Sequence, residues 1–354
     1  MKIDVVNLNK NAIFIISSLL MISHCTPTLE EKVDQIFSSY QGENVPGAAV
    51  MLIQDGIPIL KKTYGMANIE KEIPVSLNTN FRLASVTKQF TSMCILMLIE
   101  AKKLEYSTTL VEIFPEFPEY GKTITITNLL QHTSGLLAYE DLIPDTAIVP
   151  VTDTDVLRMM MEQDSTYFTP GSSYRYSNSG YAVLAKIVEK ISGISFANFL
   201  RKYIFEPVGM NNSVAHQRGI SEVPNRAFGY TVSTDSISFS DQSLTSAILG
   251  DGGIYSSIED LYKWDQTLYT NKLVRGETLS LAFTPNLEIY GFGWRIDEYE
   301  RHWRVHHTGS TCGFRTVIQR FPNDQFTVII LTNRRDPDVA PLAEKLVDLY
   351  LIGK

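Results

Sequence analysis

The protein has 354 residues, of which 44% are hydrophobic and 20% are charged, and its formal net charge is −8. This is the composition of an ordinary globular chain, long enough for one large domain or two coupled ones. The acidic balance, without a basic run or an interleaved aromatic stripe to follow phosphates, argues against a nucleic acid as partner.

A candidate export signal opens the chain. Lys2 and Lys10 precede an apolar run at 12–22, which is too short for a stable membrane span and suits the hydrophobic part of a secretory signal. Cys25 follows where a bacterial lipoprotein places its acylated cysteine, although His24 stands where that signal prefers a small residue. We predict a signal and tether over residues 1–28 and an exported protein, periplasmic or membrane-anchored in a bacterium. Lipidation of Cys25 and ordinary cleavage nearby both stay open.

The other two cysteines, Cys94 and Cys312, are too few to define a disulfide framework. We interpret both as buried thiols. A bridge between them stays open, because an oxidising compartment would permit one.

Strand-like segments occupy both ends of the remaining chain. After a helix over 29–40, the runs GAAVMLIQDG and IPILKKTYG meet at Asp55-Gly56, which is a hairpin signal. Four more runs, YGFGWRIDEYE, HWRVHHTG, FRTVIQRF and QFTVIILTN, lie near the far end, and a helix over about 339–351 closes the chain.

The segment between these ends has mostly helical apolar spacing. We predict an α+β domain over 29–354, with an antiparallel sheet built from residues 29–84 and 285–354, flanking helices, and an inserted helical subdomain at about 85–284. A cleft between the two parts is the expected site, and the loop at 138–152 should supply much of its pocket.

The stretch LASVTKQFTSM places Ser85 three residues before Lys88, at the start of a helix that is apolar almost all round to Leu104. Such a helix should be buried, where a charged lysine is costly. Positions i and i+3 share a helix face, so Lys88 can reach the Ser85 hydroxyl as a base, beside first-turn N–H groups suited to an oxyanion. The alternative is a capping serine and a surface lysine.

Two further elements complete a candidate site. Tyr176-Ser177-Asn178 precedes an amphipathic helix, where the phenol can relay a proton and the amide can hold a substrate carbonyl or orient Lys88. The alternative is that Ser177 and Asn178 cap the helix while Tyr176 packs.

The last element is His307-Thr308-Gly309, on a strand-like run. Gly309 would let a substrate approach closely, the N–H near Ser310 would be a second oxyanion donor, and an edge strand would bind an extended acyl group. A simple strand-to-turn exit is the alternative.

Together, in this order, the three elements resemble the active-site motifs of the serine β-lactamase and penicillin-binding-protein superfamily, especially its class C-related branch with esterase and D-aminopeptidase-like relatives. The likeness covers roughly Val33 to Tyr350 and includes LLQHTSGL, GDGGIYSSIEDLYKW and GFGWRI.

The resemblance implies a role for each motif residue and no cofactor. Ser85 would be the acylated nucleophile, and Lys88 and Tyr176 would be the general base and acid in an order that stays open. Asn178 would orient the substrate, and His307 to Ser310 would form the substrate strand. We interpret two other family phrases, at His132 and at Gly250 to Gly253, as structural.

One departure from the family pattern concerns His307, which stands where the β-lactamases carry lysine. A mostly neutral imidazole attracts a substrate carboxylate less than an ammonium does. We therefore predict hydrolysis of an ester or a D-residue-containing amide, from a small-molecule or cell-wall-derived substrate, with weak or absent β-lactamase activity. A β-lactamase or DD-peptidase proper is the alternative, and the oligomeric state is not predicted.

Two rival classes of function deserve comparison. A metal hydrolase is suggested by His302, His306 and His307, but strand positions four apart lie about 13 Å from each other, too far for one zinc. A non-catalytic receptor for cell-wall fragments is the second rival, and the chemically competent residues of all three motifs argue against it.

Overall fold

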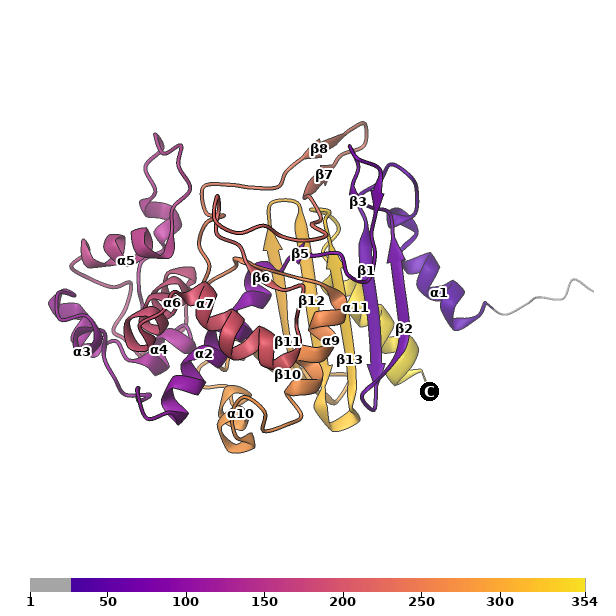
Figure 1. The fold of residues 1–354 in the computed structure, drawn as a ribbon. Helices are drawn as coiled ribbons and strands as arrows, with labels where there is room; N and C mark the ends of the chain where they lie inside the picture. Colours follow the sequence, from indigo (N-terminus) through magenta and orange to yellow (C-terminus); the bar gives the residue numbers. More distant parts are fainter. Residues whose placement is uncertain (1–26, 354) are drawn as a thin grey trace, which may run out of the picture.

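A six-stranded antiparallel sheet joins strands from the two ends of the chain (Figure 1). The computed structural model describes residues 27–353, so the predicted signal and Cys25 lie outside the described residues. The sheet order is β10-β11-β12-β13-β1-β2. The strands are β1 Ala48–Gln54, β2 Ile57–Tyr64, β10 Arg295–Tyr299, β11 His302–Thr311, β12 Phe314–Phe321 and β13 Phe326–Thr332. The predicted α+β fold class and the sheet built from both ends are confirmed.

The first hairpin of this sheet turns where the sequence predicts. Asp55 and Gly56 both have positive φ, 53° and 76°, as a tight two-residue hairpin turn requires. Strand β1 then pairs on its other side with β13, from Ala48 opposite Thr332 to Gln54 opposite Phe326. The N-terminal hairpin is thus built into the C-terminal sheet.

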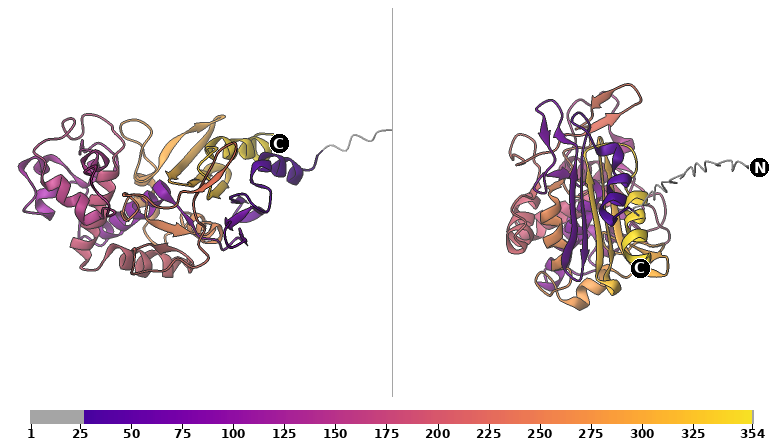
Figure 2. Two further views of the ribbon diagram at one scale, coloured as in Figure 1. Left: turned by 90° about the horizontal axis from the view of Figure 1, so that it is seen from above. Right: turned by 90° about the vertical axis from the view of Figure 1, so that its right-hand side faces the viewer.

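Helices cover both faces of the sheet, which explains why β1 is buried along almost its whole length. Alternate residues point to opposite faces of a strand. Val50 and Leu52 pack in one core with α1 (Leu29–Ile36) and α11 (Ala340–Val347). Ala49 and Met51 belong to the larger core that includes α2 (Lys88–Glu100) and α9 (Ile258–Thr267). Figure 2 shows α1 and α11 together on one side of the sheet.

The segment between the sheet strands contains most of the helices and several short strands. The helices are α2 Lys88–Glu100, α3 Leu110–Ile113, α4 Ile126–Leu130, α5 Asp153–Met161, α6 Asn178–Ser192, α7 Phe196–Leu200, α8 Glu206–Val208, α9 Ile258–Thr267 and α10 Gly276–Ala282. The short strands are β3 Met66–Asn68, β4 Ile73–Pro74, β5 Phe81–Arg82, β6 Val214–Ala215, β7 Tyr230–Val232, β8 Ile237–Phe239 and β9 Ile254–Ser256. Because α9 packs on β1 and β13, part of this segment covers the sheet. The domain boundaries stay predictions.

Some predicted element ends differ from the structure. The helix expected over 29–40 is α1 followed by a 3₁₀ turn at Ser38–Tyr40. The helix expected from Ser85 becomes α-helical only at Lys88, after a 3₁₀ turn at Ala84–Thr87.

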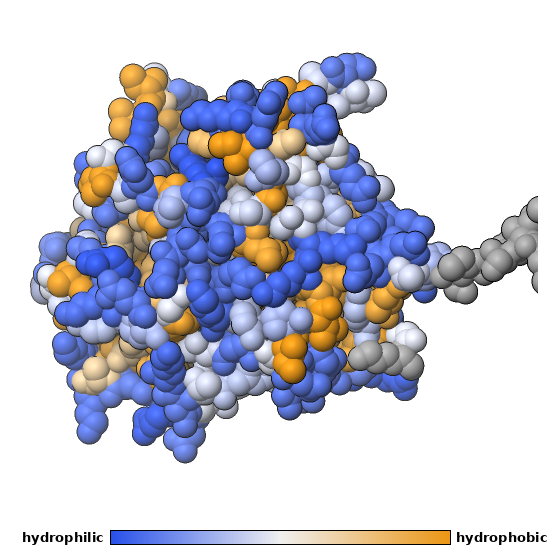
Figure 3. Space-filling view, turned by 45° about the vertical axis from the view of Figure 1, so that its right-hand side comes forward, coloured by the Kyte–Doolittle hydropathy of each residue, from blue (hydrophilic) through white to orange (hydrophobic). Residues whose placement is uncertain are grey.

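The two cysteines within the described residues are both free thiols, so the bridge left open by the sequence is not formed. Cys94 is buried in α2 (Lys88–Glu100) as interpreted, but the interpretation of Cys312 as buried is wrong, because this residue is partly exposed in the turn between β11 and β12. Across residues 27–353, we find no helix with the length and apolar character of a membrane span. On the face shown in Figure 3, hydrophobic residues are scattered in small groups among hydrophilic ones.

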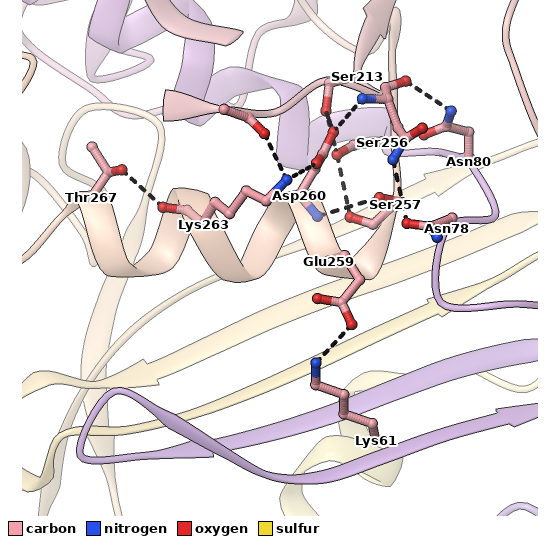
Figure 4. A network of polar contacts seen from close by, with 12 residues as sticks. Lys61, Asn78, Asn80, Ser213, Ser256, Ser257, Glu259, Asp260, Lys263 and Thr267 are labelled. Carbon is pink, nitrogen blue, oxygen red and sulfur yellow. Dashed lines mark hydrogen bonds and ion pairs between the residues drawn. The ribbon is translucent and has the colours of Figure 1, made fainter. Parts of the chain in front are cut away.

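Helix α9 is attached to the sheet by one buried and one partly exposed ion pair. Arg320 Nε of β12 donates to Asp265 Oδ1 at 2.6 Å, with both side chains 1% exposed, and the Thr327 hydroxyl of β13 donates to the same oxygen at 3.0 Å. At the other end of α9, Lys61 Nζ of β2 lies 2.7 Å from Glu259 Oε1, with both side chains partly exposed (Figure 4).

The two ion pairs should differ in their effect on stability. Asp265→Asn leaves the Arg320 guanidinium buried without its anion, and we expect it to lower the free energy of unfolding by about 3–5 kcal/mol. Glu259→Gln, the matched control on the same helix, should cost at most about 1 kcal/mol. Urea denaturation of both variants measures the difference, and equal losses would contradict this account.

Candidate active site

The candidate nucleophile lies in a tight turn before a buried helix. Ser85 belongs to the 3₁₀ turn at Ala84–Thr87, and Lys88 is the first residue of α2. Lys88 Nζ lies 3.2 Å from Ser85 Oγ, so the predicted i to i+3 contact forms. Ala84 has a φ of +49°, a left-handed conformation that is costly for alanine and that clusters at functional sites.

The side chain of Lys88 is fully buried, and its amine meets three hydrogen-bond acceptors. Besides Ser85 Oγ, it donates to Asn178 Oδ1 at 2.8 Å and to the backbone carbonyl of Asp251 at 2.9 Å. Three acceptors match the three N–H donors of a lysine ammonium, which compensates its removal from water. The ring of Tyr176 adds a favourable face 5.0 Å from Nζ.

The second motif both caps helix α6 and orients Lys88, the two roles that the sequence left open. Ser177 is the N-cap of α6, because its Oγ accepts from the Gly180 N–H at 3.1 Å. Asn178 begins the helix and orients Lys88 through its carbonyl oxygen, while its amide nitrogen donates to Glu140 Oε1 at 2.7 Å. The sequence interpretation missed Glu140.

Tyr176 lies beside Lys88, and its hydroxyl is buried without a hydrogen-bond partner among the described residues. Its ring packs against His132, with 4.3 Å between the ring centroids. An unpaired buried polar group is uncommon and calls for an explanation. A proton relay through this hydroxyl remains a prediction.

The third motif forms a free strand edge at the site. Strand β10 pairs with β11 only from His302 to His306, so residues 307–311 extend beyond the end of β10. Ser310 and Thr311 line the cleft that contains Ser85. Binding of a substrate along this edge stays a prediction.

His307 itself is buried and has partners at both ring nitrogens. It is 1% exposed, its Nε2 lies 2.9 Å from the Tyr290 hydroxyl, and its Nδ1 lies 2.7 Å from the Thr308 carbonyl. Burial and the nearby Lys88 charge hold the pKa of His307 well below its usual value. The imidazole is neutral, as the sequence suggests, and it does not face an incoming carboxylate.

At Gly309 the structure shows a close approach of the protein's own backbone, and the approach of a substrate there stays a prediction. A Cβ at this position would lie 2.1 Å from the Leu83 carbonyl oxygen and 2.3 Å from Thr316 Oγ1. The missing side chain therefore lets the turn before Ser85 pack on β11. In addition, the Thr316 hydroxyl donates to the same Leu83 carbonyl at 2.8 Å. The glycine serves the protein's own backbone at this point.

His132 and the run from Gly250 to Gly253 have structural surroundings, as interpreted. His132 is fully buried, and its Nδ1 accepts from the Ser177 N–H at 3.0 Å, which fixes the loop that carries Tyr176. A Cβ at Gly250 would lie 2.3 Å from the Tyr181 carbonyl oxygen. The run also has a role that was missed, since Asp251 supplies an acceptor to Lys88.

The cleft around Ser85 is small and mostly polar, with a volume of about 100 Å³. It is lined by Arg82, Ala84, Ser85, Tyr139, Glu140, Asn178, Thr245, Asp251, Gly252, Ser310 and Thr311. Tyr139 and Glu140 come from the loop that was expected to supply the pocket, but their individual roles had no local signal. The Tyr139 hydroxyl donates to Asp251 Oδ2 at 2.9 Å.

The other histidines of the C-terminal strands have separate acidic neighbours. His302 Nδ1 lies 3.0 Å from Asp324 Oδ2, and His306 Nε2 lies 3.3 Å from Asp297 Oδ2. The described part of the chain has no group of three or more His, Cys, Asp or Glu side chains arranged to hold a metal ion.

Comparisons with known proteins agree with the motifs. A protein-family model described as Beta-lactamase matches residues 33–351. Penicillin-binding protein 4* of Bacillus subtilis is 33% identical over 308 residues, which cover 81% of this chain and 68% of that protein. The predicted resemblance is therefore confirmed.

Solved structures share the fold. The octameric penicillin-binding protein homologue from Pyrococcus abyssi aligns with a TM-score of 0.79 and 26% identity, covering 92% of this chain and 77% of that one. The D-amino acid amidase from Ochrobactrum anthropi aligns with a TM-score of 0.75 and 20% identity, covering 91% and 96%. Because only 20% of the residues are identical, the likeness to the amidase is evidence for the fold and not for a shared activity.

The electrostatics around Lys88 predict a pH-dependent effect of Asp251→Asn. Burial raises the pKa of Asp251 from 3.8 to about 6, against the lowering effect of Lys88. Because this pKa is higher in the folded state than in the unfolded state, protonation of Asp251 stabilises the fold. This contribution to the free energy of unfolding is complete below about pH 4 and is lost as the pH rises through about 6. Asparagine stays uncharged and can still accept from Tyr139.

We therefore expect the free energy of unfolding of Asp251→Asn, minus that of the wild type, to increase between about pH 4 and pH 6. The increase should be at most about 1.4 kcal/mol per pH unit. Urea denaturation at several pH values measures this difference. A difference that stays constant or decreases over this pH range would contradict the raised pKa of Asp251.

Proposed function

Because the chain belongs to the β-lactamase family, we propose that it is an exported serine hydrolase that forms an acyl-enzyme at Ser85. The substrate class is an ester or a D-residue-containing amide. The observation that carries the proposal is the buried Lys88 amine, which contacts Ser85 Oγ in a cleft beside a free strand edge. Export rests on the apolar run at 12–22.

The contacts of Lys88 suit a base that changes its protonation state. In the neutral amine, two N–H groups donate to Asn178 and to the Asp251 carbonyl, and the lone pair accepts the Ser85 proton. In the ammonium, the third N–H donates to Ser85 Oγ. The same three contacts therefore serve both states without movement of the side chain.

We assign the second proton transfer to Tyr176, whose buried hydroxyl has no hydrogen-bond partner among the described residues. As Ser85 attacks the carbonyl, Lys88 takes its proton and Tyr176 delivers a proton to the leaving group. The backbone N–H groups of Ser85 and Ser310 hold the oxyanion. Water then releases the acyl group by the reverse sequence.

Weak β-lactam turnover is part of the proposal. The third motif offers no exposed cation for a β-lactam carboxylate, since His307 is buried, neutral and bonded to Tyr290. The penicillin-binding relatives favour a second candidate, a peptidase that recognises penicillin.

Covalent labelling separates these candidates. The protein, truncated after Cys25, is treated with a fluorophosphonate probe and separately with a penicillin, and its intact mass is measured. We expect one adduct with the probe, none with Ser85→Ala, and no stable adduct with penicillin. Stable penicillin labelling would favour the second candidate, and no Ser85-dependent adduct would favour a non-catalytic receptor.

Steady-state rates rank the same substrates. The kcat/KM for short p-nitrophenyl esters should exceed that for a chromogenic cephalosporin. A much higher value for the cephalosporin would overturn the ranking.

Tyr176→Phe tests the proton relay. Loss of a positioned acid or base should lower kcat about 10²–10⁴-fold, with an unchanged thermal midpoint by circular dichroism. Tyr174→Phe is the matched control, because Tyr174 also has a buried hydroxyl without a partner in the described structure. Near-normal rates for Tyr176→Phe, or equal losses in both variants, would remove Tyr176 from the mechanism.

A further inference from the structure

Arg295 places a positive charge beside the tyrosine of the second motif. It is the first residue of β10 and pairs with His306 of β11, so it lies next to the point where the free strand edge begins. Its guanidinium carbon lies 5.6 Å from the centroid of the Tyr176 ring and 5.8 Å from that of the Tyr290 ring. A cation from outside the three motifs thus accompanies Tyr176.

The acidic group nearest to Arg295 along its own strand is engaged elsewhere. Asp297 follows two positions later, and its carboxylate lies 2.8 Å from Arg304 Nε and 3.3 Å from His306 Nε2. Among the residues that the structure describes, no carboxylate forms an ion pair with Arg295. Its charge therefore acts on the aromatic rings that it contacts.

The charge of Arg295 also reaches the buried imidazoles around Tyr176. Burial, followed by the charges of Lys88 and Arg295, lowers the pKa of His307 well below its usual value. Burial and neighbouring charges that include the same two cations lower the pKa of His132. With both imidazoles neutral, Lys88 and Arg295 are the groups that supply positive charge next to the tyrosine ring.

The proposed proton transfer from Tyr176 requires such a charge. As the substrate carbonyl carbon parts from its leaving group, the phenol O–H bond breaks and the proton bonds to the leaving group. The electron pair of that O–H bond stays on the Tyr176 oxygen, which takes a proton back from the water that releases the acyl group. This oxygen has no hydrogen-bond partner within the described structure. Nearby fixed charge is therefore the means of stabilising the phenolate as it forms.

We propose that Arg295 stabilises the phenolate of Tyr176 and so enables the enzyme to expel leaving groups that need a proton, such as alcohols and amines. This inference rests on the proposed serine hydrolase function. Lys88 Nζ lies 5.0 Å from the centroid of the same ring, but Lys88 changes its protonation state during the cycle, whereas a guanidinium is always charged. Arg295 is not among the residues that line the cleft, so it acts through Tyr176 and does not contact the substrate.

Two esters with the same acyl group separate this role from a structural one. p-Nitrophenyl butyrate releases a stable anion that needs no proton, whereas ethyl butyrate releases ethanol and depends on a proton from the enzyme. Butyrate release is measured by mass spectrometry, and kcat/KM reports the acylation step. Arg295→Gln should lower kcat/KM for the ethyl ester roughly tenfold or more and change that for the p-nitrophenyl ester by less than about twofold.

Arg175→Gln is the matched control. Arg175 directly precedes Tyr176, but its guanidinium lies over the Tyr167 ring, 3.7 Å from the centroid. Loss of this charge should leave both esters at wild-type rates. Arg295→Lys keeps a cation at position 295 and should retain most of the rate on the ethyl ester.

A double variant tests whether Arg295 acts through Tyr176. On ethyl butyrate, Tyr176→Phe combined with Arg295→Gln should lose no more activity than Tyr176→Phe alone, because no phenolate forms. A further loss in the double variant would overturn the role of Arg295, as would equal losses on both esters, or no loss on either, in Arg295→Gln.

Fluorophosphonate labelling separates failure of this inference from failure of the proposed function. If the wild type is labelled at Ser85 but hydrolyses neither ester, or the p-nitrophenyl ester alone, the role of Arg295 is overturned while the nucleophile stands. The absence of both hydrolysis and labelling would overturn the serine hydrolase function as well.

Discussion

The arrangement of the site depends on the complete burial of the Lys88 amine. A cationic group removed from water costs several kcal/mol unless acceptors replace its hydration. Those acceptors come from the turn before α2, from the start of α6 and from the loop that contains Asp251. Each segment must therefore dock correctly for the others to be stable. The requirement that stabilises the centre of the molecule also places a nucleophile, a base and an amide together.

Close backbone contacts hold the nucleophile's turn in its strained conformation. Strand β11 can approach the Leu83 carbonyl because Gly309 has no side chain, and Thr316 donates to the same carbonyl. These contacts act on the residues just before Ser85, where Ala84 has its positive φ. A strained backbone persists when its surroundings over-determine it, and here the sheet and the turn provide that constraint.

The sequence predicted contacts that are local along the chain, and strand patterns and the three motifs also indicated the sheet built from both ends and the Asn178–Lys88 contact. Contacts outside those patterns were not predictable. The Ser85–Lys88 contact spans three residues, so its spacing alone indicated it, and the Asp55-Gly56 hairpin was equally local. The Asp251 carbonyl meets Lys88 across 163 positions, and Glu140 meets Asn178 across 38, so no periodicity connects them. Gly309 was recognised as a close approach, but the identity of the approaching group depended on tertiary packing.

His307 of the third motif adds no positive charge at the place where β-lactamases carry a lysine. Its pKa is held low by burial and by Lys88, so the strand adds no positive charge near the nucleophile. Positive charge beside the nucleophile comes instead from Lys88 and Arg82, whose hydrogen bonds go to uncharged oxygens and leave their charges in place. A lysine at position 307 would place a second cation near Lys88 and would oppose the burial of both charges, whereas the neutral imidazole adds no such repulsion.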